Sequence, residues 1–359
     1  MKRKLNKKGI AFISFFVFLI LLCVITCFVY FSKLGSVSSD SSVVDFKVVD
    51  GDTYNGIANR LEDENLIQSA LAYKIYIKLH PKDTLKAGIY ELNSNMDVSE
   101  IVDVLSSGNF KEEHIKMTFK EGINMKGIAS VIAENTNYSE DDVFNLLKDE
   151  SYIDSLINSY WFLTDSIKNS DIYYPLEGYL FPNTYEFRVD ADVKDIFKVL
   201  LDQMDVELSK YKSQIESSDY SVHELLTLAS IVELEAGSSH ERNGVATVFY
   251  NRIKAGWTLG SDVTTYYAVQ KSFKEDLLAS ELSACNAYNT RGTCFKGLPV
   301  GPISNPSHES IEGVMNPTVS DYYYFVADKN GKTYFTKTSS EHEQIIAKLK
   351  REGLWYVYE

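Results

Sequence analysis

The chain has 359 residues, enough for two or three domains, and its hydrophobic content of 45% is ordinary for a globular protein. The formal net charge is −14, but residues 1–34 hold six of the 36 Lys and Arg side chains and no acid. The remainder therefore carries 30 basic and 50 acidic side chains, which argues against nucleic acid or anionic lipid headgroups as its partners and allows a neutral one such as a glycan.

The N-terminus predicts a membrane anchor. Residues 1–8 carry five positive charges and no acid, and residues 9–32 then run without a charge, which is long enough to cross a bilayer as a helix. A cleavable signal peptide has a shorter apolar region, roughly 7–15 residues, and a small-residue cleavage site, which is not found here. We expect an uncleaved transmembrane helix over 9–32, with 1–8 in the cytoplasm and the rest outside the cell.

A short flexible linker is expected over 33–42, because Ser and Gly dominate the sequence GSVSSDSS there. The next stretch, 43–110, reads as a small α+β module. Its expected elements are a strand in VVDFKVVDG, a helix capped by Asp52 and Thr53, a helix over 67–80, a strand in KAGIYEL, and a helix opened by Asp97 and closed by Gly108.

The first part of this module resembles a LysM-like module. The resemblance rests on a hydrophobic strand, a Gly and then an Ile-Ala-x-x-Leu pattern at Ile57 to Leu61. Such modules are often used against wall glycans, so the resemblance implies glycan binding. A plain spacer domain is the alternative.

A connecting α+β module is expected over 111–170. It holds a strand in HIKMTF, a turn at Glu121 and Gly122, two helices, and a polar helical connector from Asp149 to Ser170. The aromatic and Pro-rich run YYPLEGYLFPNTYEF, over 173–187, predicts an ordered loop. A helix capped by Asp192 follows, and the last 120 residues read as mixed α+β.

The helix expected over 221–237 carries the sharpest chemical signal. Ser221 and Glu224 have the spacing of a capping box, and Gly237 can end the helix. Its interior is almost wholly apolar, which predicts a core helix, yet Glu233 and Glu235 lie in the last turn, where an acid opposes the helix dipole. Helical spacing puts Glu235 above an apolar lane, but an exposed carboxylate at a frayed helix end would also fit this pattern.

Four cysteines are present. Cys23 and Cys27 lie within the predicted membrane span, and Cys285 and Cys294 lie nine positions apart outside it. In an oxidising compartment we favour a disulfide between Cys285 and Cys294, which would contribute about 2–3 kcal/mol; two free thiols are the alternative.

Common catalytic motifs are missing. The sequence has no Gly-x-Ser-x-Gly, no Gly-rich phosphate loop and no His-Glu-x-x-His, and its cysteines are too few for a zinc cluster. We therefore expect no metal and no cofactor. Carboxylate chemistry beside polar loops is what remains.

An ordered set of motifs resembles the MltG (YceG-like) endolytic murein transglycosylases. The set comprises LEGYLFPNTYEF, ASIVELEAG, VATVFYNRI, LGSDVTTYYA, AYNT, GLPVGPISNP and YYYFVADKNGKTYFTKTSSEH. Together with the anchor and the LysM-like module, the resemblance covers nearly the whole chain. It implies an α+β fold with a catalytic domain over 171–359.

The resemblance assigns the catalytic acid to the second Glu of Glu-x-Glu, which is Glu235 here. Glu233 and Asp262 are then candidate supporting carboxylates. The candidate substrate-binding residues are Asn251, Arg252, Ser261, Thr264, Tyr288, Asn289 and Thr290, although each has a structural role as an equal alternative. This chain departs from the usual family pattern at Val263, Val300 and Arg291, and its cysteine pair brackets the last of these loops.

The reaction that this resemblance implies cuts the MurNAc–GlcNAc bond within nascent glycan strands and leaves a 1,6-anhydroMurNAc end, with one Glu acting first as acid and then as base. One alternative is a hydrolytic muramidase, which needs a second carboxylate, either Asp262 or Glu233. Another is a non-enzymatic wall-binding or division scaffold. The expected partners are glycan strands, cell-wall synthases or division proteins, and the membrane, with no nucleic acid.

Overall fold

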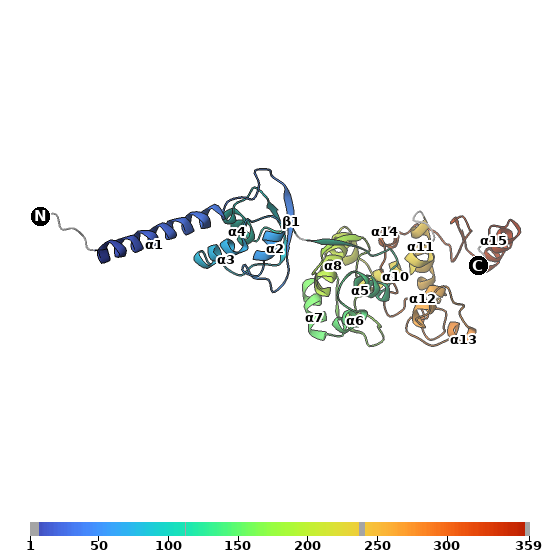
Figure 1. Cartoon of the computed structure of the whole chain (residues 1–359). Coiled ribbons are helices and arrows are strands. Elements are labelled where there is room, and N and C mark those ends of the chain that lie inside the picture. Colours follow the sequence, from blue (N-terminus) through green and yellow to red (C-terminus); the bar gives the residue numbers. More distant parts are fainter. Residues whose placement is uncertain (1–6, 112, 237–240, 356–359) are drawn as a thin grey trace. The chain divides into compact units, whose positions relative to one another are not determined.

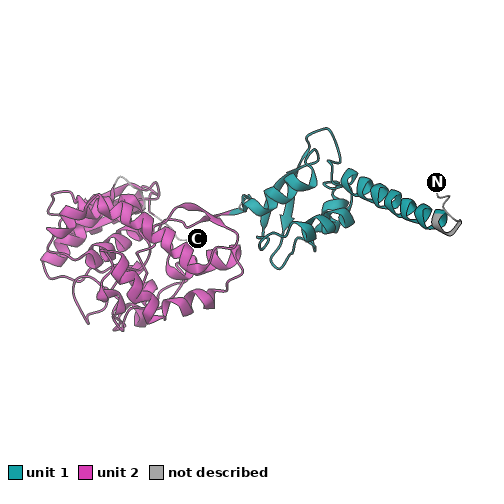
Figure 2. Cartoon of the chain, turned by 90° about the vertical axis from the view of Figure 1, so that its left-hand side faces the viewer, with its two compact units in different colours: residues 1–114 teal, residues 115–359 magenta. Residues whose placement is uncertain are grey.

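The computed structural model describes residues 7–111, 113–236 and 241–355, with side chains from residue 10 onward. It has two compact units, residues 1–114 and 115–359, coloured separately in Figure 2. Helices dominate, and the described strands form three two-stranded sheets, β1–β2, β3–β4 and β5–β6. The predicted α+β class is therefore confirmed at this coarse level.

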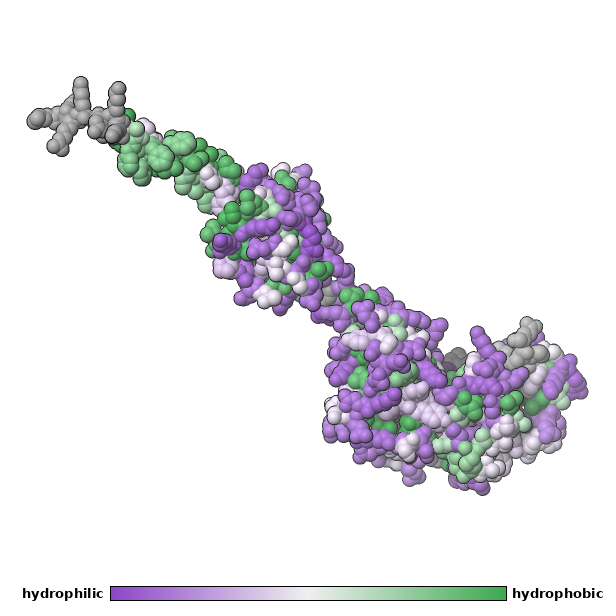
Figure 3. All heavy atoms as spheres, turned by 60° about the horizontal axis from the view of Figure 1, so that its bottom comes forward, coloured by the Kyte–Doolittle hydropathy of each residue, from purple (hydrophilic) through white to green (hydrophobic). Residues whose placement is uncertain are grey.

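The first unit begins with a long apolar helix, α1 (Lys7–Ser32). Residues Ile10–Ser32 are long and apolar enough to cross a membrane, and none of the most apolar stretch is buried within the protein. Figure 3 shows the hydrophobic surface that follows from this exposure. An N-terminal candidate membrane span is thus present where the sequence predicts one.

The segment after α1 differs from the flexible linker expected there. The Gln68 amide donates to the carbonyl of Ser36 (2.8 Å), and Ser38 N donates to the carbonyl of Ser94 (3.0 Å). The Ser94 hydroxyl donates in turn to the carbonyl of Asp40 (2.7 Å). The polar composition predicted a flexible backbone here, but these hydrogen bonds hold the segment against the rest of the first unit.

The rest of the first unit packs three helices with one antiparallel strand pair (Figure 1). In order these are β1 (Val43–Val48), α2 (Ala58–Asp63), α3 (Ala70–Leu79), β2 (Gly88–Asn93) and α4 (Val98–Ser107). Phe46 lies opposite Tyr90 across the pair, and both side chains are fully buried. The predicted helix start at Asp97 and end at Gly108 are confirmed, and the structure adds a capping box between Asp97 and Glu100 and a left-handed Gly108 after α4.

The cap predicted at Asp52 and Thr53 is wrong, because α2 begins only at Ala58 and has no side-chain cap. The Asp52 carboxylate instead accepts from Val49 N (2.9 Å) and pairs with Arg60, and the Thr53 hydroxyl accepts from Gly56 N (3.1 Å). These contacts build a turn before the helix. Short polar residues are equally suited to turns and to caps, so the local pattern could not separate the two.

The second unit has sixteen described helices and strands. They are β3 (His114–Thr118), α5 (Met125–Asn135), α6 (Glu140–Leu147), α7 (Glu150–Ser159), the 3-10 helix η1 (Asp165–Lys168), β4 (Thr184–Arg188), α8 (Val193–Ser209), α9 (Lys212–Glu216), α10 (Val222–Glu235), α11 (Arg242–Lys254), α12 (Asp262–Ala268), α13 (Ala279–Leu282), α14 (His308–Met315), β5 (Tyr324–Ala327), β6 (Thr333–Thr336) and α15 (Ser339–Arg351).

One hydrophobic core runs through this unit, from Met117 to Met315. It includes residues on both sides of the boundary predicted between 170 and 171, and that boundary stays a prediction. The helical connector expected from Asp149 to Ser170 differs from the structure, since α7 ends at Ser159 and Phe162 and Leu163 are buried in this core. The apolar Trp-Phe-Leu run was the signal for burial.

The centre of the unit is α10, which contacts α11, α12 and α14. The Ser221 hydroxyl accepts from Glu224 N (3.3 Å), and the Glu224 carboxylate accepts from Ser221 N (2.8 Å), so the predicted capping box is confirmed. Every residue of α10 from Val222 to Val232 is buried except Glu224, which confirms the core helix. Gly237, predicted to end it, lies outside the described residues.

Candidate active site

The two acids at the end of α10 have different partners. The Glu233 carboxylate accepts from Arg242 Nη2 (2.8 Å), from Ser307 N (2.8 Å) and from the Ser307 hydroxyl. Burial alone would raise the pKa of Glu233, but the hydrogen bonds from Ser307 and the Arg242 charge bring that pKa below its usual value. Glu233 is therefore an ionised group that ties α10 to the starts of α11 and α14.

Glu235 has the opposite electrostatic character. It accepts one short hydrogen bond, from Ser261 Oγ to Oε1 (2.6 Å). Burial raises the pKa of Glu235 and the Asp262 charge raises it further, against the opposing effects of Ser261, Arg252 and Arg291. The residue is largely but not completely buried. A carboxyl group that holds its proton more strongly than usual and is reachable from solvent can act as a general acid.

Ser261 is held in place by a buried network of hydroxyl groups. Its N–H donates to Thr290 Oγ1 (3.1 Å), its carbonyl accepts from Thr264 Oγ1 (2.7 Å), and the two threonine hydroxyls lie 2.8 Å apart. Ser261, Thr264 and Thr290 are all buried. The structure thus brings these three predicted site residues together behind Glu235, where Thr264 and Thr290 position Ser261 and do not face solvent.

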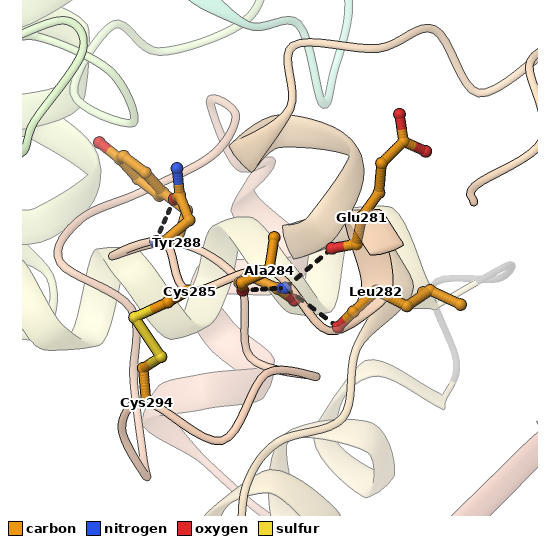
Figure 4. Close-up of a disulfide and its surroundings, with 8 residues drawn as sticks. Glu281, Leu282, Ala284, Cys285, Tyr288 and Cys294 are labelled. Carbon is orange, nitrogen blue, oxygen red and sulfur yellow. Dashed lines mark hydrogen bonds between the residues drawn. A yellow bond between two sulfur atoms is a disulfide. The ribbon is translucent and has the colours of Figure 1, made fainter. Parts of the chain in front are cut away.

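Tyr288 and Asn289 are buried too. Tyr288 packs among aromatic rings, with centroids 4.9 Å from Tyr173 and 4.8 Å from Tyr267. The Asn289 amide donates to three carbonyls, those of Glu281 (3.1 Å), Leu282 (3.1 Å) and Ala284 (2.8 Å) (Figure 4). Of the two roles left open for them, these contacts favour the structural one.

The same loop carries the disulfide between Cys285 and Cys294, whose Cα atoms lie 5.6 Å apart (Figure 4). The bridge closes the segment that presents Asn289 and Thr290 to the rest of the site. The alternative of two free thiols does not apply to this structure.

Breaking this bridge is expected to lower stability by about 2–3 kcal/mol, because the short loop regains conformational freedom in the unfolded chain. The measurement is urea unfolding of a soluble form spanning residues 33–359, with and without reductant. A Cys285→Ser/Cys294→Ser variant should match the reduced protein and should not respond to reductant. Equal midpoints for the oxidised and reduced wild type would contradict the prediction.

Asn251 and Arg252 fasten a loop to α11. The Asn251 amide donates to the carbonyls of Ser320 (3.0 Å) and Tyr322 (2.9 Å), and Arg252 Nε donates to the carbonyl of Tyr323 (2.8 Å). Arg252 Nη1 also donates to the carbonyl of Leu259. The positive charge of its guanidinium opposes the rise in the pKa of Glu235. Arg252 therefore both holds this loop and acts electrostatically on the candidate acid.

Asp262 forms an ion pair with Arg291 (2.8 Å) at the start of α12, and its side chain is 56% exposed. Arg291 was noted in the sequence only as a departure from the family pattern. The structure gives it a partner in the candidate site.

Sequence reasoning missed two residues. Arg242 pairs with Glu233, and Glu177 is a buried carboxyl whose side chain reaches α5 and α12. Glu177 lies inside a quoted motif and Arg242 lies between two of them, but no periodic pattern in the sequence signals either set of contacts. Among the residues that the structure describes, no cluster of His, Cys, Asp and Glu could hold a metal ion.

Removing the Ser261 hydroxyl is expected to raise the pKa of Glu235, because the hydrogen bond favours the charged carboxylate. If protonated Glu235 is the acid, activity falls as pH rises through its pKa. Ser261→Ala should therefore move the alkaline limb of kcat/KM to higher pH and slow the reaction roughly tenfold. Ser283→Ala, which removes an exposed serine hydroxyl, is the matched control. An unmoved limb would refute the role of Ser261.

The chain is similar to several known proteins. The sequence profile of the YceG-like family matches residues 46–348. A protein of Bacillus subtilis named endolytic murein transglycosylase is 37% identical over 316 residues, which is 87% of each chain. One of that name from Streptococcus pneumoniae is 31% identical over 353 residues, 93% of this chain and 64% of the relative's length.

A solved structure is also similar. The crystal structure of a YceG-like protein of Listeria monocytogenes aligns with a TM-score of 0.61 and 34% identity, covering 85% of this chain and all of the other. Since the family profile spans most of both units and relatives above 30% identity cover most of the chain, this chain belongs to the YceG-like family.

Proposed function

We propose that this chain is a membrane-anchored endolytic lytic transglycosylase of peptidoglycan. The names of its relatives support the activity, and one observation carries the assignment of the residue. Of the two acids at the end of α10, Glu233 is held as a carboxylate by Arg242 and Ser307. Glu235 has a raised pKa and, among the residues that the structure describes, accepts a side-chain hydrogen bond from Ser261 alone.

In the proposed reaction Glu235 protonates the glycosidic oxygen between MurNAc and GlcNAc, and the bond from that oxygen to MurNAc C1 breaks. The resulting Glu235 carboxylate then takes the proton of the MurNAc C6 hydroxyl while the oxygen of that hydroxyl forms a bond to C1. This step closes the 1,6-anhydro ring and returns Glu235 to its protonated form. Because the nucleophile is already part of the substrate, neither water nor a second carboxylate is needed. A raised pKa suits the first step, and the nearby Arg252 suits the charged state between the steps.

Product mass tests the proposal. Digestion of purified glycan strands should give new ends that are one water lighter than reducing ends, and internal cuts should appear before terminal fragments accumulate. Reducing ends would favour a hydrolytic muramidase, with Asp262 as the second carboxylate. Asp262 is the better candidate for that alternative because its side chain is 56% exposed, whereas Glu233 is buried in its ion pair with Arg242. Intact strands under every condition would favour a wall-binding scaffold.

We further propose that α1 spans the cell membrane once, with residues 1–8 in the cytoplasm and both folded units outside. The basic flank of the apolar helix supports this orientation. Protease added to intact protoplasts should then digest both units, and protection of the second unit would reverse the orientation.

Residues 43–110 are proposed to be a LysM-like module that binds glycan. Supporting this is the order β1–α2–α3–β2, in which two helices lie between paired antiparallel strands. If residues 115–359 sediment with wall glycan as strongly as residues 33–359, this part does not bind. Cell-wall synthases or division proteins are the proposed protein partners, to be tested by crosslinking in cells.

A further inference from the structure

Glu177 is a buried carboxyl group in the loop before β4, with 1% of its surface exposed. Its Oε2 atom accepts from Met125 N (3.0 Å) and from the Tyr267 hydroxyl (3.0 Å). Its Oε1 atom accepts from the Asn305 amide (3.3 Å). One side chain thus joins the start of α5, the last turn of α12 and the loop before α14.

Burying a carboxyl group is unfavourable unless its oxygens are satisfied, so a side chain in this position calls for an explanation. The contacts on Glu177 are all donors, and no ion pair with it is found among the described side chains. Its negative charge helps to raise the pKa of the tyrosines Tyr174, Tyr267 and Tyr288. An aromatic or aliphatic side chain would fill the same space but could not hold three segments together.

The hydrogen bond from Tyr267 connects Glu177 to Glu235. Tyr267 lies on α12, which begins at Asp262, directly after the serine that donates to Glu235. A seven-residue helix is short, and a hydroxyl bond near its far end restrains its position. The hydrogen bond from Tyr267 to Glu177 therefore fixes the helix that presents Ser261 to Glu235.

The second link leads to Glu233. Asn305 exchanges main-chain bonds with the turn before α5, from Gly122 N to its carbonyl (3.0 Å) and from its own N to the carbonyl of Ile123 (2.8 Å). Two residues on, Ser307 donates to Glu233. The loop that anchors the ionised acid is therefore held by the same Glu177.

We propose that Glu177 is a positioning residue that acts on both acids of α10, through Tyr267 and α12 on Glu235 and through Asn305 on Glu233. The inference rests on the proposed function for its kinetic consequence. Its structural part, the placement of Ser261 against Glu235, does not depend on that function.

Burial raises the pKa of Glu177 to about 8, against the hydrogen bonds from Met125, Tyr267 and Gly178. The link to α12 does not depend on the charge. Oε2 accepts two hydrogen bonds and Oε1 accepts one longer one, so Oε1 is the oxygen that a proton would occupy at the lower cost in hydrogen bonds. The acceptor for Tyr267 is then kept in both states.

Tyr267→Phe removes only the hydroxyl and tests this link. It is expected to lower kcat roughly 3–10-fold with little change in KM, and to move the alkaline limb of kcat/KM to higher pH as Ser261 loosens from Glu235. Tyr185→Phe is the matched control, since that hydroxyl donates to the carbonyl of Phe181 (2.8 Å). Equal pH profiles for Tyr267→Phe and wild type at equal stability would overturn the proposal.

Two substitutions at Glu177 sharpen the test. Glu177→Gln keeps an oxygen acceptor for Tyr267 and should lose less than about threefold in kcat, whereas Glu177→Leu keeps none and should lose at least as much as Tyr267→Phe. An equal loss in both would overturn the acceptor role. Should Glu177→Leu not fold, Tyr267→Phe still decides.

A readout without turnover separates this proposal from the proposed function. The 13C NMR titration of the Glu235 carboxyl group should show a higher pKa in Tyr267→Phe than in wild type and in Tyr185→Phe. If wild type cleaves nothing but the Glu235 titration moves, the proposed function fails and the positioning role stands. An unmoved titration refutes the positioning role even if wild type is active.

Discussion

Replacing Glu235 with Gln is expected to slow cleavage of purified glycan strands by about 10²–10⁴-fold, the range typical of a lost general acid or base. The amide keeps an oxygen that can accept the Ser261 hydrogen bond, so the local contacts survive the change. The measurement is the rate at which anhydro ends appear, followed by mass. Glu309→Gln, an exposed carboxylate on α14, is the matched control.

Glu235→Gln is expected to lower activity without lowering stability. The pKa of Glu235 is raised in the folded protein, so the stability linked to its protonation is present below the unfolded pKa and is lost as pH rises through the folded pKa. Glu235→Gln removes that loss and should be at least as stable as wild type at neutral pH. A folded variant that still cleaves at the wild-type rate would refute Glu235 as the acid.

Arg242→Met is expected to give the largest loss of stability, about 3–5 kcal/mol, because it leaves a charged carboxylate buried without its partner. The Glu233 and Arg242 side chains are only 5% and 9% exposed, so water cannot replace the contact. For a protein whose total stability is typically about 5–15 kcal/mol, this is a large fraction. Urea unfolding of the soluble form at neutral pH is the measurement.

The double variant Glu233→Gln/Arg242→Met provides the control, since it removes both charges. It should be more stable than the sum of the two single changes predicts. The pKa of Glu233 is lowered in the folded protein, so this pair stabilises above the unfolded pKa and the contribution is lost as pH falls. Strictly additive losses would show that the pair is not coupled.

Local features of the fold were predictable where the signal lies within one turn of chain. Ser221 with Glu224 forms the capping box that their spacing indicates, and Asp97 opens its helix as predicted, because each signal belongs to one helix start. Asp52 fails as a cap because its partner, Arg60, lies further along the chain. A cap and a turn use the same residues, and only the fold decides between them.

The difference between Glu233 and Glu235 could not be derived from helical spacing. It arises from donors far along the chain, Ser307 for one acid and Ser261 for the other, 74 and 26 residues away. The resemblance to a family selected Glu235, and the described contacts supply a physical reason to expect the same choice. Thr264 and Thr290 show the reverse case, since the sequence leaves a substrate-binding and a structural role equally open for them and both lie buried behind Ser261.

The fastened segment between α1 and β1 has a consequence for how the protein would search its surroundings. With α1 in a bilayer, diffusion is confined to two dimensions, and a slack tether would still let the first unit swing through a hemisphere. The bonds of Gln68 and Ser94 to residues 36–40 remove that slack. The first unit would then stay close to the membrane surface and turn less freely than a unit on a slack tether.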